Sequence, residues 1–392
     1  IVVTSTADSG PGTLRAAFEE VNANCLDRAC KIDFALAPPV PSEGWFTIVP
    51  ETPLPVLRAP RVYLDATTQT KLTGDTNPKG PEVAIDGRKA GQGLEIHAEC
   101  GTLVRGFALG NFHANEALWM THDRRICVDR THLERDVFEI SENHIGVDPS
   151  GTTPWPNRRW LILDDAAALV TDNVISSNTF SGVWMWRGAA TFYGNLIERN
   201  GASGIFFGPE VQYGEVLFNT INWHRDMGVA VARGARQIDI RRNSMRGNVG
   251  LGIDWGLDGP SPVVEDDSDM PTNPPVVLSA VYDEATDETV VTMTLRSMPR
   301  TQVFNAWVIN VYANDAPDGD GEKHIAEQQL PSVPEGPFAV RARGNHAGKW
   351  LNATSSRVHY IVFSRPGEPR TESFGGGETL TSELSNSVRV TP

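Results

Sequence analysis

Two acidic side chains, Glu215 and Asp239, recur at the same point of a repeated segment, and Arg241 follows two residues after the second. Side chains alternate between the faces of a strand, so we expect all three groups on one outward face, with the carboxylates on consecutive coils. Two neighbouring carboxylates can split their pKa values and serve as acid and base in glycoside cleavage. The arginine could bind a uronate or stabilise charge in lyase chemistry. The alternative is an ordinary solvated face that carries charges without catalysis.

The turn formed by Trp223, His224, Arg225 and Asp226 is a second candidate for chemistry. Neighbouring repeats carry Asn, Gly and Ala at most of these positions, so an imidazole, a guanidinium and a carboxylate replace small residues here. Such departures from local consistency often mark functional sites. His224, Arg225 and Asp226 are therefore predicted as catalytic residues, and Trp223 as a substrate-binding residue. A surface ion pair would explain Arg225 and Asp226 equally well.

Aromatic side chains form a third candidate. Trp184, Trp186 and Phe206 alternate with apolar residues that should point inward, which predicts an exposed aromatic column that Trp119 extends. Such rings stack on the apolar faces of pyranose sugars, so the column has the character of a glycan-binding groove. The alternative is that a loop or the C-terminal domain covers the rings. We expect four residues of this repeat to point inward: Val183, Ile205, Val229 and Ile253. Ala230 and Asp254 are expected to point outward and to continue the column.

Two acidic clusters raise the hypothesis of a calcium site, because Ca²⁺ binds about six to eight oxygen ligands. Neither cluster has the spacing of an EF-hand, and Ca²⁺ is the only cofactor that the sequence suggests. The first cluster comprises Asp254, Asp258, Glu265, Asp266, Asp267 and Asp269, of which Asp254, Asp258, Asp267 and Asp269 are the predicted metal ligands, and the second comprises Asp315, Asp318, Asp320 and Glu322.

An internal repeat must position all of these groups. Asn173, Asn195, Asn219 and Asn243 are spaced by 22, 24 and 24 residues, and each begins a similar segment. A unit of this length cannot bury its own apolar face and must stack on copies of itself, which predicts a β-solenoid. The repeated asparagine tolerates left-handed backbone geometry and can hydrogen-bond to the equivalent turn of the next coil.

Specific motifs point to a known family. The segment from Asn143, N-H-I-G-V-D-P-S-G-T, resembles the N-x-I-G-T-D-P-T-G-T coil of bacterial secreted right-handed parallel β-helix repeat proteins of the pectin-lyase-like superfold. Residues 3–17 resemble their N-terminal cap, and residues 64–69 and 84–87 resemble their early coils. The resemblance extends to about residue 275 and implies the fold. It does not imply an activity, because one fold hosts many functions and these proteins are mostly of unassigned function.

The fold class follows as all-β, with two domains. Residues 1–273 are expected to form the right-handed parallel β-helix, and residues 13–24 an amphipathic cap helix with Leu14, Ala17, Phe18 and Val21 on one side. A linker rich in Pro and Asp precedes residue 274. From there, short runs of β-branched and aromatic residues predict an antiparallel, immunoglobulin-like β-sandwich over residues 274–392.

Composition limits the class of partner. The net charge is −15 and the pI about 5.1, so nucleic acid would be repelled. No apolar stretch reaches the length of a membrane helix, and the abrupt strand-like start suggests a processed, secreted or cell-surface protein. We therefore expect a polysaccharide or cell-surface glycan as partner, and a hydrolase or lyase that binds and cleaves polysaccharide. The acidic charge disfavours a pectate-like substrate. A noncatalytic adhesin or envelope scaffold is the alternative function.

Cysteine spacing generates a testable prediction. Pairing Cys25 with Cys30 and Cys100 with Cys127 closes the two shortest loops, and the alternative is four reduced, buried cysteines. We expect no titratable thiol in the denatured, unreduced protein, and four after reduction. Free thiols before reduction would contradict the pairing.

Overall fold

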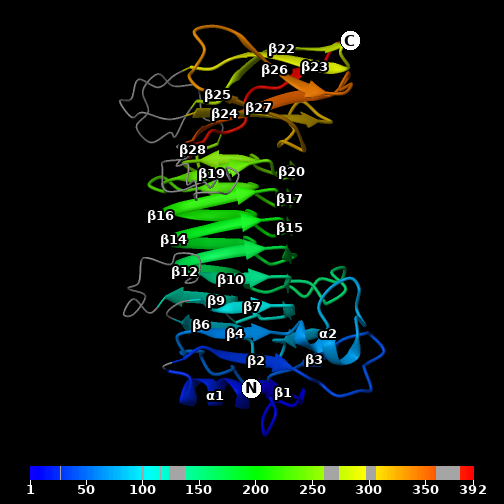
Figure 1. The fold of residues 1–392 in the computed structure, drawn as a ribbon, viewed down its shortest axis with the longest axis vertical. Helices are drawn as coiled ribbons and strands as arrows, with labels where there is room; N and C mark the ends of the chain where they lie inside the picture. The colour runs from blue at the N-terminus through cyan, green and yellow to red at the C-terminus, as the bar shows by residue number, and fades with distance from the viewer. Residues whose placement is uncertain are drawn as a thin grey trace, which may run out of the picture. The chain divides into compact units, whose positions relative to one another are not determined.

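The fold is a right-handed parallel β-helix with an N-terminal helical cap, followed by an antiparallel β-sandwich, as predicted (Figure 1). Within its described residues the chain packs into two compact units, Ile1–Val211 and Gln212–Pro392. The predicted domain boundary at residue 274 stays a prediction. The computed structural model describes residues 1–26, 28–98, 101–114, 116–122, 137–259, 273–296, 306–358 and 380–392.

The elements are almost all short strands. The first unit contains the helices α1 (Leu14–Asn24) and α2 (Thr68–Thr73). Neither helix in the described ranges has the length and apolar character needed to span a membrane. The strands of this unit are β1 (Val2–Val3), β2 (Cys30–Phe34), β3 (Phe46–Ile48), β4 (Val62–Asp65), β5 (Val83–Asp86), β6 (Leu94–Ala98), β7 (Leu103–Arg105), β8 (Phe107–Gly110), β9 (Glu116–His122), β10 (Phe138–Ser141), β11 (His144–Ile145), β12 (Arg159–Thr171), β13 (Val174–Ser176), β14 (Val183–Tyr193) and β15 (Leu196–Glu198).

The second unit begins within β16 (Ile205–Leu217) and changes from parallel to antiparallel pairing after β21. Its other parallel strands are β17 (Thr220–Asn222), β18 (Val229–Val231), β19 (Ile238–Arg241), β20 (Ser244–Arg246) and β21 (Ile253–Trp255). Its antiparallel strands are β22 (Val276–Asp283), β23 (Glu288–Thr294), β24 (Ala306–Asn314), β25 (Lys323–Leu330), β26 (Phe338–Arg343), β27 (Trp350–Val358), β28 (Leu380–Thr381) and β29 (Val388–Arg389).

Each regular coil contributes to three faces. In the first unit, the first face contains β6, β9 and the beginnings of β12 and β14. The second face contains β2, β4, β7, β10 and the ends of β12 and β14. The third face contains β3, β5, β8, β11, β13 and β15. All of these strands pair in parallel, so equivalent residues of successive coils lie side by side.

The interior confirms the predicted register. Val183, Ile205, Val229 and Ile253 are all buried, each on the strand where the repeat places it. A shift of one residue would turn the whole set toward solvent, because side chains alternate along a strand. The repeat therefore predicts correctly which side of each of these strands forms the core.

Buried asparagines join successive coils, as predicted. In the first unit the Asn143 side chain donates to Oδ1 of Asn173 (3.1 Å), and the Asn173 side chain donates to Oδ1 of Asn195 (3.0 Å). A second ladder of the same kind joins Asn157, Asn178 and Asn200 at 2.9 and 3.1 Å. Within each ladder the side-chain amides donate hydrogen bonds to, and accept them from, the asparagines of neighbouring coils. A buried column of these amides therefore has little desolvation penalty.

The predicted left-handed geometry of the repeated asparagine is wrong. The left-handed residue is the one immediately before it, because the asparagine side chain must point into the coil to reach its neighbours. This preceding residue is exposed or half-buried. Positive φ angles of 56°, 55°, 58° and 56° occur at Glu142, Asp172, Phe218 and Arg242, each just before a ladder asparagine.

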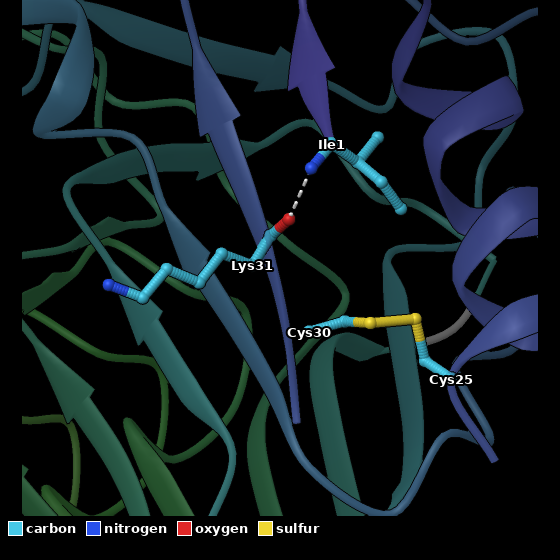
Figure 2. Close-up of a disulfide and its surroundings, with 4 residues drawn as sticks. All are labelled: Ile1, Cys25, Cys30 and Lys31. Atoms are coloured by element: carbon cyan, nitrogen blue, oxygen red, sulfur yellow. Dashed lines mark hydrogen bonds between the residues drawn. A yellow bond between two sulfur atoms is a disulfide. The ribbon is translucent and has the colours of Figure 1, made fainter. Parts of the chain in front are cut away.

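The N-terminal cap matches the expectation. Helix α1 begins after Thr13, whose Oγ1 accepts a hydrogen bond from the Ala16 N–H (3.2 Å), and it buries Leu14, Ala17, Phe18 and Val21. A disulfide joins Cys25, just after the helix, to Cys30 at the start of β2, as Figure 2 shows. This confirms one predicted pair. Cys100 and Cys127 lie outside the described residues.

The β-sandwich has its own apolar core. A three-stranded sheet, β22-β23-β26, faces a second sheet built from β25, β24, β27 and β28, with β29 also pairing with β27. Val291, Met293, Ile309, Val311 and Leu351 are among the buried residues between the sheets. An immunoglobulin-like topology for this sandwich remains a prediction.

Segments near the C-terminus accept hydrogen bonds from backbone N–H groups at the edge of the last coil. Four backbone N–H groups there would otherwise be buried without a partner, which costs about 1–3 kcal/mol each. Ile240 donates to Oγ1 of Thr381 (2.8 Å), Met245 to the Gly321 carbonyl (2.9 Å), Asn248 to Oδ2 of Asp320 (2.9 Å) and Trp255 to Oε1 of Glu383 (3.2 Å).

The asparagine ladder gives a stability prediction. Asn173→Ala removes the acceptor of both the backbone and the side-chain N–H of Asn143, so the free energy of unfolding should fall by about 3 kcal/mol. Urea denaturation measures this change. Thr179→Ala, an exposed change on the same coil, is the control and should cost less than about 0.5 kcal/mol. Equal stabilities of the two variants would contradict a structural role for the ladder.

Asp320 gives a prediction on pH. Burial raises the pKa of its carboxyl from 3.8 to about 6, although the Asn248 N–H stabilises the charged form. Because the pKa of Asp320 is higher in the folded state, its protonated carboxyl stabilises the fold fully below pH 3.8. This stabilisation is lost as the pH rises through about 6 and the carboxyl ionises. Asp320→Asn keeps an acceptor for Asn248, so it should be more stable than wild type at neutral pH by up to about 3 kcal/mol. The difference should shrink below about pH 4. Thermal unfolding across this range measures it, with exposed Asp75→Asn as the control.

Candidate functional site

An aromatic cluster lies on the outer side of the first face, where the sequence predicts it. Ile162 on β12 pairs with Trp119 on one side and with Trp184 on the other, so these three side chains form one column. The Phe206 ring lies 4.3 Å from that of Trp184, and the Trp186 ring lies nearly parallel to Trp184 at 6.2 Å between centroids. Because Phe206 and Trp184 cover part of each other, Trp186 is the most exposed ring, at 40%.

A double β-bulge presents Trp186. Leu163 pairs with Met185 and Asp164 with Arg187, so Trp186 is an extra residue in β14 without a register partner. Ala166 then pairs with Gly188, which leaves Asp165 as an extra residue in β12, with a φ of 55°. Bulges re-aim side chains and are common beside binding sites. Here Trp186 is exposed as the alternation from Val183 requires, and the alternation is interrupted just after it.

An ion pair lies beside the exposed indole. The Arg187 Nε donates to Oδ1 of Asp164 (2.8 Å), and both side chains are partly exposed. The Asp164 carboxylate, followed by the charges of Asp165 and Glu210, raises the pKa of the Arg187 guanidinium. The site therefore combines a stacking surface with hydrogen-bond donors and acceptors.

Gly188 lies at the end of the bulge, where β14 passes from the first face to the second. Its φ is 103°, and a Cβ there would lie 2.3 Å from the Ala166 carbonyl oxygen, so only glycine fits this position without strain. Immediately after it, β14 joins the second face. The aromatic column and the column that contains Thr191 therefore belong to different faces of the first unit.

The predicted pairing of Glu215 with Asp239 is confirmed, but the predicted exposure of Asp239 and Arg241 is wrong. Glu215 lies directly opposite Asp239 in the register of β16 and β19. Asp239 and Arg241 are only 1% and 3% exposed, and they bind each other through two guanidinium nitrogens at 2.6 Å. Thr381 Oγ1 also donates to Asp239 (3.3 Å). The Asp239 carboxylate is therefore buried and ion-paired, whereas the sequence predicts it on an outward face.

Glu215 also has a local partner. The Tyr213 hydroxyl, two residues before it on the same strand, hydrogen-bonds to Glu215, and burial together with the Glu215 charge raises the pKa of the phenol. Asp239 and Arg241 thus form a buried pair that contacts Thr381 of the C-terminal strand β28, and Glu215 lies on the preceding coil. The catalytic role of Glu215 and Asp239 stays a prediction, but Asp239 lacks the exposure that the sequence predicts.

The turn at Trp223 also has a structural explanation. His224 is buried at the position that a ladder asparagine occupies in other coils, and its backbone N–H donates to Oδ1 of Asn248 (3.1 Å). The Trp223 ring lies against Gly247, where an added Cβ would be 2.6 Å from the indole. Arg225 is exposed and Asp226 half-buried. His224 is therefore enclosed in the ladder, and its predicted catalytic role stays a prediction.

The aromatic column does not continue as an exposed groove. Ala230 and Asp254, predicted to point outward, are paired in register as expected, but both are buried. Burial raises the pKa of the Asp254 carboxyl, whose Oδ2 accepts a hydrogen bond from Gly259 (3.3 Å). The exposed part of the column is therefore confined to the coils that carry Trp119 to Phe206.

Calcium binding remains a prediction. Asp258 forms an ion pair with Arg233 (2.7 Å), whereas residues 265, 266, 267 and 269 of the same cluster lie outside the described residues. In the second cluster, Asp315 pairs with Lys349 and Asp320 accepts a hydrogen bond from Asn248. No group of three or more metal-binding side chains gathers among the residues that the structure describes.

Comparison with known proteins supports the fold. A family model described as a right-handed beta helix region matches residues 156–261, a range that includes β14 and β16. No curated protein matches the sequence.

Two solved structures show weak similarity. Chitinase ChiW from Paenibacillus sp. str. FPU-7 is 10% identical with a TM-score of 0.19, covering 93% of this chain and 24% of the chitinase. Tailspike protein 2 of Escherichia coli O157:H7 bacteriophage CAB120 is 10% identical with a TM-score of 0.23, covering 93% of this chain and 65% of the tailspike. The chain thus spans less than two thirds of either protein, and similarities this weak do not bear on function.

Sequence reasoning missed the charged part of the site. Asp164, Asp165 and Arg187 were not predicted as functional, because a bulge cannot be recognised from one strand alone. The available signal was the pair Asp164-Asp165 inside an otherwise apolar run, Leu161 to Val170. Two adjacent carboxylates in a strand interrupt the alternation that a regular face requires.

Proposed function

We propose that this protein is an extracellular polysaccharide-binding protein whose binding surface is the aromatic cluster of the first face. The observation that carries the proposal is the bulged, exposed Trp186 beside the Asp164–Arg187 ion pair. An indole stacks on the apolar face of a pyranose, and carboxylate and guanidinium groups hydrogen-bond to its hydroxyls. Sugar recognition needs both kinds of contact next to each other.

Positioning on a rigid sheet favours binding. Trp184, Trp186 and Phe206 lie on strands that are hydrogen-bonded to their neighbours, so little conformational entropy is lost when a ligand orders these rings. A glycan is a repeating polymer, and the aromatic column runs across successive coils with a spacing of about 4.8 Å between strands. Several sugar rings of one chain can therefore contact the cluster at the same time.

Binding without cleavage is the form of the function that we favour. The sequence suggests an acid and a base at Glu215 and Asp239, but Asp239 is buried and paired with Arg241. This loss of the candidate pair supports the noncatalytic alternative, an adhesin or envelope protein that holds a glycan.

The proposed location rests on the disulfide. Cys25–Cys30 would be reduced in most cytosolic compartments, so it favours an oxidising, extracellular environment.

Substitution of the exposed indole tests the proposal. Trp186→Ala should weaken glycan binding by about tenfold, because the loss of one stacking ring costs on the order of 1 kcal/mol or more. Affinity electrophoresis or calorimetry with a panel of polysaccharides measures this change. Tyr193→Ala is the matched control, since Tyr193 is 46% exposed at the other end of the same strand. Equal binding by wild type and Trp186→Ala for every bound glycan would refute the assignment.

A further inference from the structure

A polar cluster lies beside Trp119, at the end of the aromatic column that is farther from Trp186. The cluster comprises Arg58, Gln92, Glu95 and His97. Glu95 on β6 pairs in register with Trp119 on β9, and the His97 ring lies edge-to-face with the indole at 5.5 Å between centroids. Because Ile96 between them is buried, Glu95 and His97 point outward, on the same side as the column.

Contacts between the side chains hold the polar cluster in one arrangement. The Glu95 carboxylate lies 2.7 Å from Nε2 of His97 and accepts a hydrogen bond from the Gln92 amide (2.8 Å). From the preceding coil, the Arg58 guanidinium contacts Nδ1 of His97 (3.4 Å). The four side chains are therefore joined in a continuous chain of polar contacts within the first unit.

The polar cluster has hydrogen-bonding capacity beyond these contacts. A guanidinium has more N–H donors than the one that Arg58 uses among the described residues, and a carboxylate has more lone pairs than the two contacts of Glu95 require. Arg58 is exposed, and the other three side chains are half-buried. The described residues thus leave donors and acceptors within reach of a ligand.

Such a cluster has the properties needed to bind sugar hydroxyls. A hydroxyl both donates and accepts, so a carboxylate and a guanidinium can hold it from either side. Side chains that already fix each other lose little conformational entropy on binding. The neighbouring Trp119 supplies a stacking surface. The same combination occurs at the other end of the column, where the Asp164–Arg187 ion pair lies beside Trp186.

The two ends are separated by a distance that one extended glycan can span. Ile162 lies between Trp119 and Trp184 in the register, so these two indoles are two strands apart, or about 10 Å. A glycan must therefore contain several sugar units to contact both ends. It must also run across the strands, from one coil to the next.

We propose that the polar cluster and Trp119 form a second glycan subsite, and that one linear, uncharged glycan crosses the coils from this subsite to Trp186. This inference rests on the proposed function, since it takes the aromatic cluster as the glycan-binding surface. It adds a polar anchor, the direction of the bound chain and a preference for long chains. The opposite charges of Glu95 and Arg58 compensate each other, which favours a neutral ligand.

The experiment compares short and long chains on the full protein. The probes are disaccharides and hexasaccharides of three neutral series, derived from cellulose, chitin and β-1,4-galactan. Calorimetry measures their binding. In a series that binds, we expect the hexasaccharide to bind at least about tenfold more tightly than the disaccharide, because only the longer chain reaches both subsites.

A substitution of the same shape isolates the polar cluster. Glu95→Gln removes the charge, and hydrogen bonds to charged groups are the stronger ones, so hexasaccharide binding should weaken by about five- to tenfold. Disaccharide binding should change by less than about twofold, because the short chain still binds at Trp186. Glu139→Gln, which removes an exposed carboxylate from β10 on the second face, is the matched control and should bind as wild type. Thermal unfolding establishes that each variant is folded.

The two indoles should differ in their dependence on chain length. Trp119→Ala should weaken hexasaccharide binding and spare the disaccharide, as Glu95→Gln does. Trp186→Ala should weaken the binding of both. A role of the polar cluster in stability alone would not produce this dependence on length.

The outcomes separate the two proposals. Equal affinity for short and long chains, or wild-type hexasaccharide binding by Glu95→Gln, would overturn the second subsite. The proposed function would stand in both cases if Trp186→Ala weakens binding. Equal losses in Glu95→Gln and Glu139→Gln would likewise contradict the subsite. Failure of every probe to bind the wild-type protein would overturn both proposals.

Discussion

Parallel, in-register stacking of coils is the constraint on which this structure depends. A coil cannot satisfy its own backbone N–H and C=O groups, so each strand must pair with an equivalent strand above and below it. Register then places identical positions side by side, and a buried polar group is acceptable only where the next coil carries its partner. The ladders of Asn143, Asn173 and Asn195 and of Asn157, Asn178 and Asn200 are the clearest result.

The same constraint explains where the candidate site can form. A regular face presents every second side chain in a fixed direction, with little room for a special orientation. At Trp186 and Asp165 each strand gains one residue relative to its neighbour, so the alternation is interrupted after the exposed Trp186 and regular pairing resumes at Gly188. The site thus uses a local break in register that the surrounding hydrogen bonds tolerate.

Stacking also requires an end. In the second unit, the edge of the last coil is met by Thr381, Gly321, Asp320 and Glu383, and a buried Asp239–Arg241 pair lies beneath β28. Acceptors of this kind are needed because an open sheet edge would pair with other chains. Residues with the chemical character of a catalytic centre are buried here and paired with each other. Their residue types alone do not distinguish the two roles.

The sequence by itself determined the coil length and which strand residues point into the core. It also determined that a β-helix precedes a β-sandwich along the chain. The spacing of Asn173, Asn195, Asn219 and Asn243 contains this information, because the pattern is local and repeats in each coil. The sequence also identified Trp184, Trp186 and Phe206 as neighbours. Tertiary structure alone decided which polar groups are accessible. Asp239 is buried and accepts a hydrogen bond from Thr381, which is 142 residues away, and Asp165 is an extra residue of a bulge defined only by the pairing of β12 with β14. Accessibility depends on segments distant in the chain, whereas alternation within one strand is a short-range property.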